Sequence, residues 1–199
     1  MASAILFDLG GVLLEPHPER AIEALSIRSG RSPEELAPEL LGVAKLGFDT
    51  GRIGPEGFAA AVGRAAGLPL SVDEVRALWC DIFDDLRPMQ ELAAALARRH
   101  PCYLLSNTDP MHFACALGRL PVLSRFRGQQ LSYEVGLLKP DPEYYRAAFR
   151  RFGLRPEECV LVDDLRPNVE AIVREGAAGI VHEGTEATKR RLAELGLSA

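Results

Sequence analysis

The chain has 199 residues, of which 47% are hydrophobic and 26% are charged, and its formal net charge is −5. This length and composition predict a globular protein with one domain, or with one domain that carries a modest insertion. The absence of a basic surplus argues against a nucleic acid or an anionic membrane as the partner. A small phosphorylated molecule remains compatible with it.

The cysteine positions and the N-terminal sequence narrow the class of protein further. The four cysteines, at positions 80, 102, 115 and 159, form no CxxC pair and do not predict a disulfide framework. The N-terminal run MASAILFDLGG lacks the basic region of a signal peptide, and no apolar run reaches membrane-spanning length. We therefore expect a protein of the reducing cytoplasm, and monomer or homodimer stays open.

In chain order, the first predicted element is a buried strand, AILF at residues 4–7, which ends at Asp8. No convincing buried strand follows until residue 85. Ser-Pro, Gly and Leu-Pro sequences instead separate segments with helical patterns, near residues 19–29, 33–46, 55–66 and 72–85. This stretch predicts an all-helical insertion after the first strand.

Beyond residue 85, apolar strands alternate with helices. Strands are predicted at 102–105, 159–162 and 179–181, with a weaker one at 129–133; helices are predicted at 89–99, 142–152, 167–175 and 187–195. Such alternation is typical of an α/β fold, a Rossmann-like parallel sheet covered by helices. We expect a core domain of residues 1–14 and 86–199, and a small helical domain of residues 15–85.

Polar residues follow three of these strands and open one of these helices. Asp8, Ser106-Asn107 and Asp163-Asp164 come directly after strands, and Lys139 precedes the helix at 142. Ligands of open α/β sheets bind at the carboxyl ends of the strands, so we expect these side chains to converge there. Three carboxylates, a lysine and a glycine-rich turn form a site for Mg²⁺ and a phosphate.

The segments FDLGGVL, LLSNT, KPDPEYY and VDDLRPN resemble motifs I to IV of the haloacid dehalogenase (HAD) superfamily, in the same order. The resemblance covers residues 4 to about 181, and the helical stretch at 15–85 is similar to that superfamily's C1 cap. Within it, the chain looks most like the bacterial sugar-phosphate phosphatases similar to α-D-glucose-1-phosphate phosphatase.

This resemblance implies a Mg²⁺-dependent phosphatase that acts on a small phosphorylated metabolite through an aspartyl-phosphate on Asp8. It implies that Asp8 is the nucleophile and a metal ligand, and that Lys139 holds nucleophile and phosphate together. The remaining implied residues are metal ligands (Gly10 through its carbonyl, Asp164 directly, Asp163 directly or through water) and phosphate-binding groups (Leu9, Gly10, Ser106 and Asn107).

One position departs from the pattern. Most superfamily phosphatases have a second aspartate two residues after the nucleophile, where it serves as general acid, and this chain has Gly10 there. General acid–base help is worth roughly 10²–10⁴-fold in rate. We therefore expect either a preference for activated phosphates, such as anomeric or acyl phosphates, or a substitute acid such as Glu15 or His17.

Two other functions stay open. A 2-haloacid dehalogenase also uses an aspartate nucleophile but generally needs no metal, and the pair Asp163-Asp164 speaks against it. A non-catalytic phosphate-binding protein could have lost the acid at Gly10, although Asp8, Ser106 and Lys139 are all retained. His182 is expected on the surface away from the site.

Overall fold

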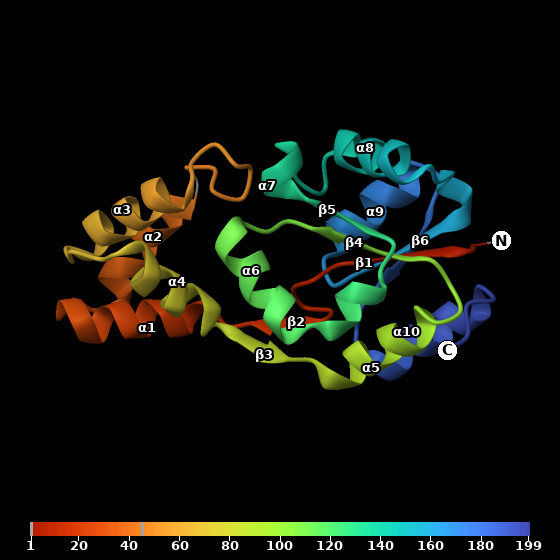
Figure 1. The fold of residues 1–199 in the computed structure, drawn as a ribbon, viewed down its shortest axis with the longest axis horizontal. Coiled ribbons are helices and arrows are strands. Elements are labelled where there is room, and N and C mark those ends of the chain that lie inside the picture. Colours follow the sequence, from red (N-terminus) through yellow and green to blue (C-terminus); the bar gives the residue numbers. More distant parts are fainter. Residues whose placement is uncertain (1, 45) are drawn as a thin grey trace.

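A five-stranded parallel sheet lies at the centre of the larger part of the molecule, with strand order β5-β4-β1-β6-β7 (Figure 1). The computed structural model describes residues 2–44 and 46–199. No helix in these ranges has the length and apolar character needed to cross a membrane. The strands are β1 (Ala4–Phe7), β4 (Cys102–Ser106), β5 (Gly128–Leu131), β6 (Cys159–Asp163) and β7 (Ala178–Val181).

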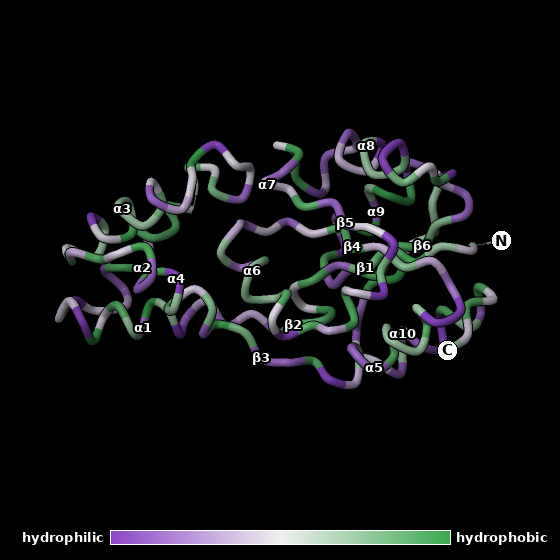
Figure 2. The backbone as a smooth tube through the Cα atoms, viewed as in Figure 1, coloured by the Kyte–Doolittle hydropathy of each residue, from purple (hydrophilic) through white to green (hydrophobic). Residues whose placement is uncertain are grey.

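The three central strands are buried along their whole length because helices cover both faces of the sheet. One face packs on α5 (Arg87–Leu96), α6 (Pro110–Arg119) and α10 (Thr185–Glu194). The other packs on α8 (Pro142–Phe152) and α9 (Arg166–Arg174). Figure 2 shows hydrophobic stretches along the central strands and mixed colours along the outer helices. The predicted α/β fold is confirmed.

Four helices form a separate layer beside the carboxyl ends of the strands (Figure 1). They are α1 (Pro18–Ser29), α2 (Pro33–Ala44), α3 (Pro55–Ala66) and α4 (Val72–Cys80). They pack around their own apolar cluster, which includes Leu25, Leu36, Phe58 and Val75. Lys45, in the predicted helix 33–46, lies outside the described residues. We propose that residues 15–85 act as a cap on a core of residues 1–14 and 86–199.

The sequence prediction missed the two strands that lead into and out of the cap. β2 (Leu14–Pro16) and β3 (Phe83–Asp85) form an antiparallel pair, so the helix predicted at 72–85 ends at Cys80. Each strand has three residues with only one buried, which is too short for an alternating pattern to be recognised. Short helical segments also replace predicted coil or strand: η1 (Pro121–Arg125), α7 (Ser132–Val135) and η2 (Pro156–Glu158).

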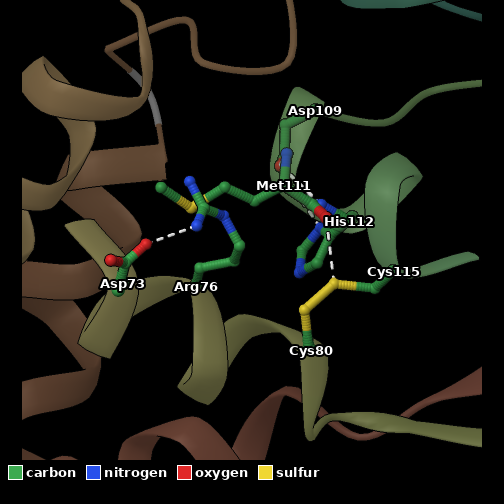
Figure 3. Close-up of a disulfide and its surroundings, with 7 residues drawn as sticks. All are labelled: Asp73, Arg76, Cys80, Asp109, Met111, His112 and Cys115. Carbon is green, nitrogen blue, oxygen red and sulfur yellow. Dashed lines mark hydrogen bonds and ion pairs between the residues drawn. A yellow bond between two sulfur atoms is a disulfide. The ribbon is translucent and has the colours of Figure 1, made fainter.

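A disulfide joins the cap to the core, contrary to the expectation drawn from cysteine spacing. Cys80 at the end of α4 and Cys115 in α6 lie 5.6 Å apart between their Cα atoms and are bonded through their sulfurs (Figure 3). Their separation of 35 residues carries no local signal, because only the packing of α4 on α6 brings them together. Cys102 and Cys159 are free and buried.

Candidate active site

Three carboxylates meet at the carboxyl edge of the sheet. Asp8 follows β1, Asp163 ends β6 and Asp164 comes next; β1 and β6 are hydrogen-bonded neighbours. One oxygen from each of the three side chains lies within 4.8 Å of the others. The structure therefore brings Asp8 beside a pair of residues that lies 155 positions further along the chain, as expected for neighbouring strand ends.

Lys139 binds two of these carboxylates. Its Nζ lies 2.9 Å from Oδ1 of Asp8 and 2.6 Å from Oδ2 of Asp163, and its side chain is 1% exposed. Burial alone would lower the pKa of Lys139, but the charges of Asp8 and Asp163 outweigh it and raise that pKa. The ammonium group therefore remains charged and holds the tips of β1 and β6 together.

The main chain of Lys139 is fixed by the residue that follows β4. The Asn107 amide donates to the Lys139 carbonyl and accepts from the Lys139 N–H, both at 2.8 Å. Asn107 therefore positions the lysine with its side chain, a contact that the sequence did not reveal. Ser106 is buried, and its carbonyl accepts a hydrogen bond from the Tyr144 hydroxyl at 3.2 Å.

The two oxygens of Asp8 have different surroundings. Oδ1 accepts from the Leu9 N–H at 2.6 Å and from Lys139, whereas no described residue donates to Oδ2. Burial, followed by repulsion from Asp163, raises the pKa of Asp8 to about 7, although Lys139 lowers it. The carboxylate thus keeps one oxygen for a ligand, and a cation beside it would favour its charged form.

Asp163 and Asp164 differ in how far protein donors occupy their carboxylate oxygens. Both oxygens of Asp163 are taken up by Lys139, by the Asn168 amide at 2.9 and 3.1 Å, and by the Leu165 N–H at 2.9 Å. Because a carboxylate oxygen has about two acceptor sites, Asp163 is close to saturated. Burial raises the pKa of the half-buried Asp164, and Asp163 raises it further. Asp164 is thus the more available ligand of the pair.

Asn168 is a site residue that the sequence analysis did not assign. It is 3% exposed, and its amide nitrogen contacts both oxygens of Asp163. The hydroxyl of Tyr145 in turn donates to the Asn168 carbonyl at 3.0 Å. The available signal was its place in VDDLRPN, one turn into the helix after the paired aspartates. Such outer partners orient metal-ligating carboxylates.

The two glycines after Asp8 differ in whether the structure has room for a Cβ atom. Gly11 has a φ of +68°, and a Cβ there would lie 2.4 Å from Cγ and Oδ2 of Asp164. Only glycine therefore lets Asp164 approach the turn. Gly10 has no positive φ, and the nearest side-chain or backbone neighbour of an added Cβ is Pro16 Cγ at 3.8 Å. A side chain at position 10 is thus sterically acceptable.

The two candidate acids of the cap also differ. Both ring nitrogens of His17 are engaged, Nδ1 by Glu19 at 3.0 Å and Nε2 by Asp84 at 3.2 Å. No described residue forms an ion pair with Glu15, and its charge contributes to the raised pKa of Asp164, after burial and Asp163. Glu15 is therefore the better placed of the two.

His182 is closer to the site than the sequence analysis placed it. Its N–H donates to the Asp163 carbonyl at 2.8 Å, so the residue sits at the same edge of the sheet. Burial lowers the pKa of its ring, and Nδ1 lies 2.7 Å from the Thr188 hydroxyl. The sequence could not show this, because the end of β7 is brought beside β6 only by the strand order.

The donor set fits a hard divalent cation. When ionised, Asp8, Asp163 and Asp164 together place three negative charges against the one positive charge of Lys139, and their oxygens converge. Mg²⁺ prefers oxygen ligands, usually one or two carboxylates, with water and phosphate oxygens completing the shell. Asp8 Oδ2 and Asp164 have the free oxygens for such an ion, while Asp163 is already bound by protein donors.

A sequence model of the haloacid dehalogenase-like hydrolases matches residues 2–176, most of the chain. The chain belongs to this family. Its membership confirms the resemblance carried by the four motifs and the expectation of a hydrolase. Among curated proteins, a D-ribitol-5-phosphate phosphatase of Bacteroides thetaiotaomicron is 27% identical over 180 residues, which cover 85% of this chain and 86% of the relative.

Solved structures of HAD enzymes share the whole architecture. A HAD family enzyme of Bacteroides thetaiotaomicron, in complex with magnesium and inorganic phosphate, superposes with a TM-score of 0.83 at 27% identity, over 92% of this chain and 95% of that one. A predicted HAD-like hydrolase of Porphyromonas gingivalis superposes with a TM-score of 0.81 at 25% identity, over 100% of both chains. An L-2-haloacid dehalogenase of Xanthobacter autotrophicus superposes with a TM-score of 0.66 at 16% identity, over 100% of this chain and 85% of that one. This likeness shows a shared fold alone.

Proposed function

We propose that this HAD hydrolase is a Mg²⁺-dependent phosphatase of a small phosphorylated metabolite, with Asp8 as nucleophile. The observation that carries the proposal is the convergence of Asp8, Asp163 and Asp164 around one point, with Lys139 as the only described cation bound to them. This arrangement suits a phosphate ester with its cation, and a halide leaving group would need no such acidic cluster. The magnesium-and-phosphate complex of the Bacteroides enzyme supports the same assignment.

Each residue has a defined task. Lys139 binds Asp8 and so orients its carboxylate. An oxygen of that carboxylate attacks phosphorus, the bond from phosphorus to the leaving oxygen breaks, and an aspartyl-phosphate forms. Water then attacks the same phosphorus, the bond from phosphorus to Asp8 breaks, and phosphate and the free carboxylate are released. Bound Mg²⁺, held by Asp8 and Asp164 with the Gly10 carbonyl, would neutralise the charge shared by nucleophile and phosphate. Ser106, Asn107 and the amides of Leu9 and Gly10 would bind the phosphate oxygens.

The leaving oxygen needs a proton, and Gly10 supplies none. Because His17 is held at both nitrogens, we propose Glu15 as the group that donates it. Glu15→Gln should then lower turnover far more than it changes KM for an alkyl phosphate. His17→Asn should change both parameters little. Equal loss of turnover in both variants would remove Glu15 from this role.

The substrate class follows from the leaving group. A site without an aspartate at position 10 favours phosphates that leave without full protonation, such as anomeric and acyl phosphates. The Bacteroides relative is named for D-ribitol 5-phosphate, a primary alkyl phosphate, and this makes polyol phosphates the competing class. The two classes differ in how steeply the rate depends on leaving-group pKa.

The deciding experiment is a panel of acetyl phosphate, glucose 1-phosphate, D-ribitol 5-phosphate and 2-chloropropionate, with Mg²⁺ or with a chelator. We expect phosphate release that needs Mg²⁺ and disappears in Asp8→Asn. We expect kcat/KM to be highest for the activated phosphates. Release of chloride that survives the chelator would establish a dehalogenase instead. Tight phosphate binding without turnover of any substrate would establish a non-catalytic protein.

A further inference from the structure

A cavity lies away from the carboxylates, beside the strand that returns from the cap. Its volume is about 570 Å³, and it is formed by α5, the end of α6, η1 and Asp85 at the end of β3. Cavities of this size are in the range that holds small molecules. None of the residues proposed for the phosphatase site lines it. The cavity is therefore a distinct feature of the core.

Four arginines line this cavity: Arg87, Arg98, Arg119 and Arg125. The pattern of α5 explains Arg87, because its buried face (Met89, Leu92, Ala93 and Leu96) turns the opposite side outward. Arg87, Gln90, Glu91 and Ala94 recur there at helical spacing and line the cavity, and Arg98 follows in the turn after α5. The short helix η1, packed on α5, adds Ser124 and Arg125 from the other wall.

The arginines are incompletely neutralised. Only Asp85 and Glu91 among the lining residues are acidic, so with four arginines the lining has a formal net charge of +2. The whole chain, by contrast, has a net charge of −5. Arg119 is paired, with Nε 3.0 Å from Oδ1 of Asp85. In the described parts of the chain, Arg87, Arg98 and Arg125 have no carboxylate within ion-pair distance. The lining therefore presents three free guanidinium groups toward one space.

From this lining we infer that the cavity is a second binding site, for a small polyanion with two or more phosphate or carboxylate groups. Guanidinium groups bind both anion types through paired N–H donors, and several of them around one space favour a multivalent anion over a single charge. The Gln90 amide and the Ser124 hydroxyl, both in the lining, add neutral donors. A bound polyanion would compete with Asp85 for Arg119.

Isothermal titration with pyrophosphate and with citrate, in low salt and without Mg²⁺, tests this inference on the full chain. We expect one saturable site in the wild type and at least a tenfold higher Kd in Arg98→Gln/Arg125→Gln. The matched control is Arg174→Gln/Arg190→Gln, which removes two exposed arginines from elsewhere on the surface. Its Kd should equal that of the wild type, because the control removes the same two positive charges but leaves the lining of the cavity unchanged.

Amide chemical shifts separate this cavity from the phosphatase site. Pyrophosphate should shift the amides of Ser124 and Arg125, and this response should persist in Asp8→Asn. Equal affinity in the two arginine double variants would overturn the inference. It would equally fall if the shifts were confined to Leu9 and Ser106, or if neither probe bound saturably. Loss of phosphatase activity plays no part in these readouts, so the two proposals fail independently.

Discussion

The carboxyl edge of the sheet and the helical cap are held by different kinds of contact. At the sheet edge, buried charges have several partners each: Lys139 binds Asp8 and Asp163, and Asn168 binds Asp163 again. In the cap, the interior is apolar and the charged pairs, such as Arg28 with Glu74, lie on the surface. Exposed pairs of that kind contribute little stability, about 0–1 kcal/mol each.

From this difference we expect the sheet edge to carry out the reaction and the cap to select the substrate. The buried network holds the carboxylate oxygens in place, and a displacement at phosphorus requires reacting atoms that are positioned in this way. The cap meets the core where α4 packs on α6, at the Cys80–Cys115 disulfide, and at Gly51, where a Cβ would lie 2.3 Å from the Tyr133 carbonyl. We therefore expect substitutions at the sheet edge to change reaction rate, and substitutions in the four cap helices to change stability or substrate choice.

The largest expected effect is a gain of activity at the sheet edge. In the Glu15→Gln background, which lacks the acid proposed above, Gly10→Asp returns a carboxylate to the site, and the added Cβ meets only Pro16 Cγ at 3.8 Å. We predict that kcat for a primary alkyl phosphate then rises, by up to roughly 10²–10⁴-fold. Gly11→Asp is the contrast, because its Cβ would lie 2.4 Å from Asp164. That variant should be inactive, and equal behaviour of the two would contradict this account of the turn.

A smaller effect should follow from removing an outer partner of the carboxylates. Asn168→Ala takes away the amide that contacts both oxygens of Asp163. We predict about 10–100-fold weaker affinity for Mg²⁺, measured as a rise in the Mg²⁺ concentration that gives half-maximal activity. Glu170→Gln, on the exposed side of the same helix, is the matched control. If Asn168→Ala loses stability but keeps its Mg²⁺ requirement, Asn168 has a packing role only.

The covalent tie between cap and core should be visible in stability. Cys80→Ser/Cys115→Ser opens a loop of 35 residues, which should lower the free energy of unfolding by about 2–4 kcal/mol. Urea denaturation measures this loss, and wild-type protein treated with dithiothreitol should match the double variant. An unchanged urea midpoint after reduction, with four free thiols counted in the untreated unfolded protein, would show that the pair is not bonded.

The smallest effect concerns a helix start inside the cap. The Ser71 hydroxyl accepts from the Glu74 N–H at 3.2 Å, and the Glu74 side chain accepts from the Ser71 N–H at 2.9 Å, so the two form a capping box. Ser71→Ala should destabilise the protein by about 1 kcal/mol without changing kcat. Ser198→Ala, at an exposed position near the C-terminus, should leave the urea midpoint unchanged.

The sheet and the acidic site were predictable from sequence because their signals are local. The three central strands β1, β4 and β6 each contain a continuous apolar run, and Asp8, Ser106 and Asp163 directly follow or end these strands. The joining of Cys80 to Cys115 and the occupation of both nitrogens of His17 depend on distant segments. The arginine cavity likewise combines α5 with η1, and no local pattern announces it.

The most direct test of the account is to trap the intermediate on Asp8. Enzyme mixed with acetyl phosphate and Mg²⁺ is quenched in acid within one turnover, and its peptides are weighed by mass spectrometry. We predict one added phosphoryl group on the peptide that contains Asp8, absent without Mg²⁺ and in Asp8→Asn. Steady phosphate release with no adduct on that peptide, undiminished in Asp8→Asn, would contradict it.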